Sequence, residues 1–250
     1  MRGIKLYNPD VAASEKLAER LFSDGMPEGI SVIYRGRNTV GVLPGAVPAC
    51  IKCFAEPGVV KGAIYGFCRL PKALRAYNNA YELLKLGFDT PQPIAAVCNT
   101  SLGLLKSSYY VCRYAEGLDD LRGAENRADF PELAKALASY MNRLHSSGVL
   151  MKDFTQGNVL FRRDESGIYH FTLVDINRVE FGVGDRKRLM SNFGAVLDTA
   201  DGLAVLAREY AALQSDPPAV EAEIREIYAR RQARLWRKRR IKEFIRGKKK

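Results

Sequence analysis

Three groups of polar residues supply the kinds of side chain that phosphoryl transfer requires. Lys52 lies in the run ACIKCF, Asp153 and Asn158 lie five positions apart in the loop KDFTQGN, and Asp175 ends the run TLVD. The reaction needs a cation beside the phosphate oxygens, oxygen ligands for Mg²⁺, and a carboxylate that orients the attacking hydroxyl and accepts its proton. Because Asp153 and Asn158 are also ordinary turn residues, the chemical interpretation depends on their occurring in order with the other two groups.

Strands and turns are predicted around the first of these groups. Segment 29–43 (GISVIYRGRNTVGVL) predicts two strands around a turn at Arg37 and Asn38. Segment 48–56 (PACIKCFAE) predicts a third strand. This third strand carries Lys52, whose apolar neighbours indicate a half-buried position.

Helices are predicted further along the chain. Residues 70–87 predict a helix that stops at Gly87, with large apolar residues at Leu74, Tyr77, Tyr81 and Leu84. Extended segments follow at 88–97 and 107–117. Residues 130–148 predict a long helix with an apolar face of Leu133, Leu137, Tyr140, Met141 and Leu144.

The order of these elements indicates the fold class. Segment 158–175 predicts a strand pair, with His170 in the second strand, and helices follow to the end. His145 is expected to brace the loop that carries Asp153. We therefore predict an α+β fold of two lobes, a small β-rich one followed by a larger helical one. The expected divisions are an N-terminal extension (1–25), an N-lobe (26–113), a C-lobe (114–224) and a basic C-terminal helix or tail (225–250).

Four short motifs resemble those of protein-kinase-like phosphotransferases. MKDFTQGNVL is similar to the kinase catalytic loop, in which an Asp precedes an Asn by five positions, and LVDIN and ACIK stand where kinases have D-F-G and V-A-I-K. The resemblance implies that Asp153 is the catalytic base, that Asn158 and Asp175 bind Mg²⁺, and that Lys52 contacts the phosphates of ATP. It also implies ATP-binding positions at Gly36, Arg37, Asn38, Gly41 and Tyr114.

Within that superfamily the chain resembles the Kdo/lipopolysaccharide kinase family. The motifs that carry this resemblance are YRGRN, GFDTPQPIA and DFTQGN. The resemblance implies an enzyme that uses ATP and Mg²⁺ to phosphorylate a sugar, Kdo or heptose, of the lipopolysaccharide inner core. The expected acceptor is a lipid-linked sugar at the cytoplasmic face of the inner membrane.

Several departures from protein kinases separate the chain from regulated members of the superfamily. Met151 and Lys152 replace the usual His and Arg of the catalytic loop, and no A-P-E motif follows Asp175. These differences suit a compact sugar or small-molecule kinase. The helix acid that pairs with the lysine of the third strand is predicted at Glu82, with Asn78 as the alternative occupant of that position.

The bulk composition excludes other classes of protein. Apolar residues make up 47% of the chain, which contains 12 Tyr and 11 Phe, so it is globular rather than disordered. The first ten residues contain no apolar core of a secretory signal, and no apolar run is long enough for a membrane-spanning helix. Five cysteines, an odd number, indicate a reducing cytoplasm. Cys50 and Cys53 form a C-x-x-C, but alternation along a strand would point them to opposite faces, so no zinc site is expected.

The positive charge is concentrated at the C-terminus. Residues 225–250 carry 13 Lys and Arg and two Glu, which accounts for the whole net charge of +11. Apolar residues form one arc of the expected helix, at Ile224, Ile227, Tyr228, Leu235, Ile241 and Ile245. Three interpretations remain open, namely a solvated helix, contact with an anionic membrane or phosphorylated glycolipid, and binding of RNA. Membrane contact is preferred to nucleic acid, because no stacking platform for bases is apparent. The alternative function is a kinase-like module of weak or different activity that binds RNA or a ribosomal particle.

Overall fold

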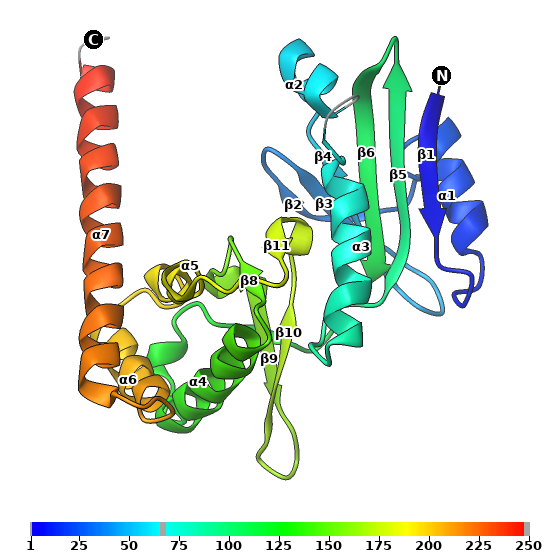
Figure 1. The fold of residues 1–250 in the computed structure, drawn as a ribbon. Helices are drawn as coiled ribbons and strands as arrows, with labels where there is room; N and C mark the ends of the chain where they lie inside the picture. The colour runs from blue at the N-terminus through cyan, green and yellow to red at the C-terminus, as the bar shows by residue number, and fades with distance from the viewer. Residues whose placement is uncertain (1, 66–68, 248–250) are drawn as a thin grey trace. The chain divides into compact units, whose positions relative to one another are not determined.

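Contacts within the chain divide it into two compact units. The structure is a computed structural model that describes residues 2–65 and 69–247. The first unit comprises Met1–Gly117 together with Leu173–Arg178, and the second comprises Leu118–Thr172 together with Val179–Lys250. Figure 1 shows the elements of both units along the chain.

An antiparallel sheet forms the centre of the first unit. Its strands, in spatial order, are β1 (Arg2–Tyr7), β5 (Pro93–Ser101), β6 (Leu104–Arg113), β4 (Ala49–Phe54), β3 (Thr39–Leu43) and β2 (Ser31–Arg35). Strands β2, β3 and β4 correspond to the three strands predicted from segments 29–43 and 48–56. Within β4, Lys52 lies opposite Tyr110 of the central strand β6. The lysine is therefore held in the interior of the sheet.

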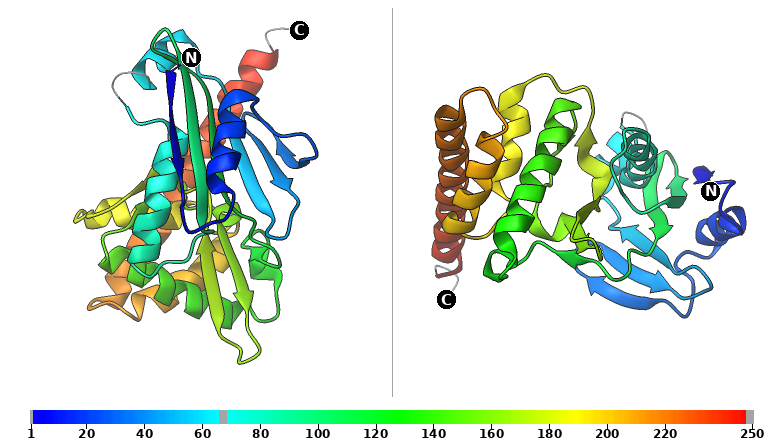
Figure 2. Two further views of the ribbon diagram at one scale, coloured as in Figure 1. Left: turned by 90° about the vertical axis from the view of Figure 1, so that its right-hand side faces the viewer. Right: turned by 90° about the horizontal axis from the view of Figure 1, so that it is seen from below.

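Two helices cover opposite faces of this sheet, as the right-hand view of Figure 2 shows. Helix α1 (Ser14–Ser23) packs through Ala18 and Leu21 against a core that includes Ile51 and Val97. Because side chains alternate along a strand, Lys52 belongs to the other face. That face carries α3 (Lys72–Lys85), which contacts β5 and β6. A short helix, α2 (Val59–Ala63), connects β4 to the region before α3.

Residues 1–25 contribute to the first unit directly. Predicted as an extension ahead of the N-lobe, they supply β1, which pairs with β5 from Arg2 opposite Thr100 to Tyr7 opposite Ala95. They also supply α1. The edge of the sheet next to β5 is therefore covered by the start of the chain.

The buried face of α3 differs from the predicted one. Leu74 and Tyr77 are buried as expected, but Tyr81 and Leu84 are exposed, at 40% and 39%. The rest of the buried face consists of Ala73, Ala76, Ala80 and Leu83. Small alanine side chains allow the helix to lie close to the sheet, and Tyr81 and Leu84, whose spacing helped to predict the helix, lie outside its buried face.

The second unit is mainly helical. Helix α4 (Phe130–Ser146) buries all five residues of its predicted apolar face, and it packs against α6 (Ala200–Ala211), which in turn contacts α7 (Pro217–Gly247). The predicted strand pair forms β9 (Val159–Arg163) and β10 (Tyr169–Leu173), with His170 in β10. The second unit also contains β7 (Asp119–Asp120), β8 (Leu150–Met151), β11 (Val179–Glu180), α5 (Arg186–Met190) and the short 3₁₀ helices η2 (Ala124–Asn126), η3 (Gln156–Asn158) and η5 (Ser191–Gly194). A further 3₁₀ helix, η4 (Ile176–Arg178), belongs to the first unit.

The C-terminal helix α7 changes its environment along its length. Ile224 and Tyr228 of the predicted apolar arc are buried, and the Tyr228 hydroxyl donates to the Asp198 carbonyl at 2.7 Å. From residue 229 to residue 241 every side chain is exposed, including Leu235 and Ile241. The first part of the arc therefore anchors the helix, while the basic part extends into solvent; the side chain of Ile245 lies outside the described residues.

Candidate active site

Lys52 and Asp175 form an ion pair in the first unit. The Nζ of Lys52 lies 2.6 Å from Oδ1 of Asp175, and the two side chains are 16% and 34% exposed. The lysine is positioned by β4, and the aspartate by the segment that follows β10. A partly desolvated pair of this kind orders both side chains and leaves them accessible to a ligand.

The backbone at Asp175 is held in an unusual conformation. Its φ is 56°, in the left-handed region, which costs a residue with a Cβ about 1 kcal/mol. Two contacts compensate for it. The side-chain amide of Asn177 donates to Asp175 Oδ1 at 2.6 Å, and that of Asn79 donates to the Ile176 carbonyl at 2.7 Å. Lys52 Nζ and the Asn177 side-chain amide both contact Oδ1 of the Asp175 carboxylate. Oδ2 is therefore the oxygen that these two contacts leave for a ligand.

Helix α3 contributes a residue that the motif search did not identify. Asn78 and Glu82, the two candidates to face Lys52, are both exposed, and in the described part of the chain the lysine pairs with Asp175 instead. The residue of α3 that reaches the Asp175 segment is Asn79. No sequence motif marks this residue, since its hydrogen bond joins positions 97 residues apart.

The turn between β2 and β3 carries the expected phosphate-loop residues. The Gly36 amide donates to the Asn38 carbonyl at 3.0 Å, and the Asn38 side chain accepts from the Ala55 amide at 3.3 Å, which ties the turn to the end of β4. Gly41 lies in β3, where a Cβ would come within 2.2 Å of Ile30. This glycine therefore has a packing role whether or not it also faces a nucleotide.

Tyr114 follows β6 at the end of the sheet. Its amide donates to the Pro48 carbonyl at 2.9 Å, and its side chain is 37% exposed. The backbone position is thus fixed by β4, while the ring is accessible to solvent.

In the second unit, Asp153 and Asn158 share one compact loop. The Asn158 side-chain amide donates to the Asp153 carbonyl at 2.8 Å, and the Thr155 amide donates to the same carbonyl at 2.9 Å. Since only the amide nitrogen can donate, Asn158 Oδ1 is the atom available as a cation ligand. Phe154, only 2% exposed, anchors the loop in the core.

A buried relay braces this loop, as predicted for His145. The imidazole contacts the Tyr210 hydroxyl at 2.8 Å through Nδ1 and Asn192 Oδ1 at 3.2 Å through Nε2. The Asn192 amide in turn donates to the Met151 carbonyl at 2.7 Å. Burial lowers the pKa of His145 to about 4, so the ring is neutral at physiological pH.

Lys152, which stands where protein kinases carry an arginine, also has a structural contact. It pairs with Glu180 of β11, which pairs with Arg188 as well. Lys152 and, more weakly, Arg188 hold the pKa of Glu180 below its usual range. The loop of Asp153 is therefore fixed on one side by a neutral relay and on the other by an exposed ion pair.

The described residues offer single oxygen donors, which suit Mg²⁺ bound together with phosphates, and no complete set of protein ligands for a metal ion. Among the described residues, no group of three or more His, Cys, Asp or Glu could hold a metal ion. Mg²⁺ keeps several waters and is usually bound by one or two protein oxygens together with substrate phosphates. Asp175 Oδ2 in the first unit and Asn158 Oδ1 in the second are each an oxygen donor of that kind.

The fold matches solved kinase structures. The chain aligns with WaaP, solved in complex with acyl carrier protein, at a TM-score of 0.60 and 14% identity over 95% of this chain and 99% of that one. It also aligns with the amicoumacin kinase hAmiN, solved with AMP-PNP, Ca²⁺ and Ami, at a TM-score of 0.50 and 10% identity over 90% and 78% of the two chains. No curated protein sequence matches the chain. The fold is an α+β protein-kinase-like fold, with a sheet in the N-terminal unit and helices in the C-terminal one.

The family match, together with the kinase-like fold, identifies the chain as a kinase. Residues 65–215, more than half of the chain, match the model of the lipopolysaccharide kinase (Kdo/WaaP) family. The chain belongs to that family.

Proposed function

We propose that this kinase phosphorylates a sugar of the lipopolysaccharide inner core, a Kdo or a heptose. The observation that carries the proposal is the family match over residues 65–215, a range that contains Asp153, Asn158 and Asp175. The ion pair between Lys52 and Asp175 supports it, because it provides a cation and a carboxylate at the positions that phosphoryl transfer requires. The acceptor sugar follows from the family and not from the fold.

Lys52 has the role of binding the phosphates of ATP. Its ammonium lies 2.6 Å from Asp175 Oδ1 on a mostly buried side chain, and it would neutralise the negative oxygens of the phosphates. Bound Mg²⁺ would neutralise the charge that develops on the transferred group. Asp175 and Asn158 are proposed to supply oxygen ligands to it through Oδ2 and Oδ1. The turn residues Gly36 to Asn38 and Tyr114 are proposed to contact the nucleotide.

Asp153 has the role of general base. Its carboxylate would accept the proton of the sugar hydroxyl as that oxygen attacks the γ-phosphorus, and would orient the hydroxyl beforehand. The contacts that hold the loop involve the Asp153 main-chain carbonyl. Asp153→Asn is nearly isosteric and keeps this main-chain carbonyl, so the contacts from Asn158 and Thr155 should persist in the variant.

The exposed part of α7 is proposed to hold the enzyme at an anionic membrane surface. None of the helices in the described residues is long and apolar enough to cross a membrane. The basic side chains between residues 229 and 241 are all exposed and can approach lipid phosphates. A lipid-linked sugar acceptor at the cytoplasmic face of the inner membrane would be within reach of an enzyme attached in this way.

The proposal is tested by mass spectrometry of core lipopolysaccharide from a strain that lacks the gene. We expect the core to lose the mass of one phosphate, and the gene in trans to restore it. A gene that encodes Asp153→Asn should fail to restore the phosphate although the protein accumulates normally. An unchanged core in the deletion strain would contradict the proposed acceptor.

A further inference from the structure

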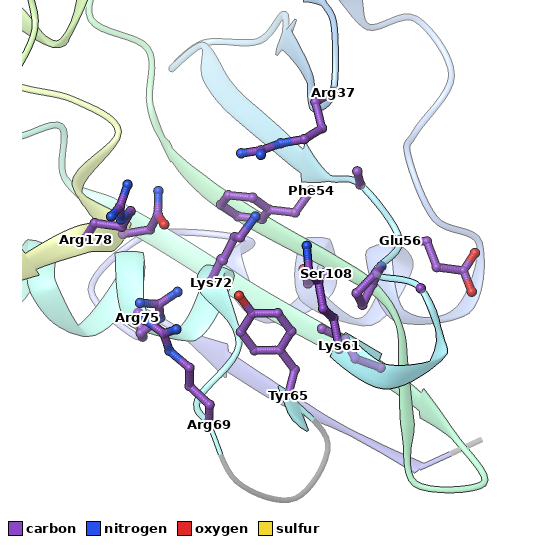
Figure 3. A pocket seen from close by; sticks show the side chains of 15 residues that line it. Arg37, Phe54, Glu56, Lys61, Tyr65, Arg69, Lys72, Arg75, Ser108 and Arg178 are labelled. Carbon is purple, nitrogen blue, oxygen red and sulfur yellow. The ribbon is translucent and has the colours of Figure 1, made fainter. Parts of the chain in front are cut away.

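A basic cavity lies in the first unit beside the Lys52–Asp175 pair. It has a volume of about 480 Å³, within the roughly 300–1,000 Å³ range of small-molecule sites. Figure 3 shows its basic side chains around Phe54 and Tyr65. Six of the lining residues are cationic, namely Arg37, Lys61, Arg69, Lys72, Arg75 and Arg178.

The charge of this cavity is not balanced by acids of the lining. Its one acidic lining residue, Glu56, pairs with Lys106 at 3.4 Å. Within the described residues, no carboxylate forms an ion pair with Lys61, Lys72 or Arg75. Like charges gathered in a concave, partly desolvated place repel one another, so the fold retains an arrangement that an anion would relieve.

The pKa values of two side chains of α3 are lowered by burial first and by neighbouring cations second. Burial, followed by the neighbouring Arg37 and Arg75, lowers the pKa of Lys72. Burial, followed by Arg69, lowers the pKa of Arg75. The Nε of Arg75 is buried and has no hydrogen-bond partner among the described residues. A buried donor of this kind normally has an acceptor, and here the cavity is where an acceptor could enter.

The cavity adjoins the phosphate end of the proposed nucleotide site and shares Arg37 with it, while its other cations belong to the cavity alone. Phe54 is the boundary, because its ring centroid lies 5.4 Å from Lys52 Nζ and 5.7 Å from Lys72 Nζ. Asn177 lines the cavity and also donates to Asp175. Lys52 and Asp175 themselves do not line it. A ligand in the cavity would therefore lie beside the Lys52–Asp175 pair without displacing it.

The lining also suits a sugar. Aromatic rings of Phe54 and Tyr65 and the polar groups of Ser108 and Asn177 accompany the cations. We infer that this cavity binds the anionic part of the acceptor, a carboxylate or phosphate carried by the sugar next to the accepting hydroxyl. The inference rests on the proposed function and adds the position and chemistry of acceptor recognition. It makes the enzyme selective for acidic over neutral sugars.

The experiment compares acidic and neutral probes by calorimetry with the full-length protein. The methyl glycoside of Kdo is titrated against its carboxamide, and a heptose phosphate against the unmodified heptose. Wild type should bind the acidic member of at least one pair about tenfold more tightly or better, the value expected for one charge-assisted hydrogen bond. The pair that shows the ratio identifies carboxylate or phosphate as the recognised group.

Substitutions of two cavity residues test whether the cavity is where the acidic group of the sugar binds. Arg75→Gln and, separately, Lys72→Gln should bring the acid-to-neutral ratio toward one while affinity for Mg-ATP stays within about twofold. Lys85→Gln removes a charge from the exposed end of the same helix and should leave the ratio unchanged. Two different variants are used so that a folding defect in one, visible as a lower melting temperature, does not decide the result.

Three outcomes would overturn the inference. Wild type could bind both members of each pair equally. Both variants could keep the full ratio. The two variants could lose Mg-ATP affinity as much as acceptor affinity, which would assign the cavity to the nucleotide phosphates. Because these are binding measurements, they remain informative if no core sugar is phosphorylated, an outcome that would refute the proposed function instead.

Discussion

Two regions of the molecule carry excess positive charge, and they hold it in different ways. The cavity of the first unit gathers six cations in a concave place, where burial lowers the pKa of Lys72 and Arg75. The second half of α7 presents its cations on an exposed helix. There Arg230 pairs with Glu226 four residues away, and Arg240 lies 4.8 Å from the Trp236 ring.

The difference predicts two kinds of anion binding. Cations that are desolvated and fixed by their elements recognise one small ligand with defined geometry, and salt screens them only partly. Cations on an exposed helix attract any extended anionic surface, at about 1 kcal/mol each near the surface, and salt weakens them strongly. The cavity should therefore bind a particular anionic substrate, and the exposed part of α7 should bind an anionic membrane surface.

The largest effect is expected from neutralising the exposed helix. Replacing Arg237, Lys238, Arg239 and Arg240 by glutamine should weaken binding to anionic vesicles at low salt by up to roughly a thousandfold, since four charges at about 1 kcal/mol each are lost. Vesicle co-sedimentation at increasing salt measures this loss of affinity for anionic vesicles. Activity on a soluble sugar fragment should persist.

A matched control replaces four exposed bases elsewhere, Lys16, Arg20, Lys85 and Lys135, and should bind vesicles almost as wild type does. If the wild-type chain ignores vesicles at low salt but binds RNA with a steep salt dependence, the helix is an RNA-binding arm and the membrane assignment is wrong. Truncation is a poorer test if it is made at Glu223, because it would remove the buried residues Ile224 and Tyr228.

A smaller effect is expected from the buried His145, whose charge depends on pH whereas that of the exposed helix does not. The pKa of His145 is lowered to about 4 from 6.5, so the unfolded chain binds more protons than the folded one between those values. Stability is complete above about pH 6.5 and is lost as the pH falls toward 4. The loss should reach about 2 kcal/mol between pH 7 and pH 5, while the lysines and arginines of the helix keep their charge.

Denaturant unfolding of wild type and His145→Gln at both pH values measures this loss. The variant should show a much smaller change with pH, although it is less stable at pH 7 because the relay to Tyr210 and Asn192 is altered. Equal pH dependence in both chains would show that other groups cause the acid sensitivity.

Much of the fold was predictable because the relevant signals are local. The turn at Arg37 and Asn38, the strand of Lys52, the stop at Gly87 and the apolar face of α4 follow from spacing of three, four or two residues. The pairing of β1 with β5 was not predictable in this way, since the partner of β1 is a strand about 90 residues later in the chain. The buried face of α3 consists largely of alanines. Because alanine is only weakly hydrophobic, the sequence pattern did not identify that face.

The candidate site was predictable to a different degree. The positions of Lys52, Asp153, Asn158 and Asp175 follow from motif order, and their assigned roles stay predictions. The role of Asn79 was hidden, because a hydrogen bond to the Ile176 carbonyl depends on how α3 meets a segment almost 100 residues away. The basic cavity was also hidden, since its cations come from separate elements and are scattered through the sequence.

The central claim is that the chain transfers phosphate from ATP to a sugar of the lipopolysaccharide core with Asp153 as base. The most direct measurement is transfer of labelled γ-phosphate to purified core oligosaccharide by wild type, by Asp153→Asn and by Asp201→Asn, a control that changes an exposed aspartate of α6. Wild type and the control should transfer label, and Asp153→Asn should be slower by about 10²–10⁴-fold with nearly unchanged affinity for Mg-ATP. Equal rates for wild type and Asp153→Asn, or no transfer by wild type to any core sugar, would contradict the account.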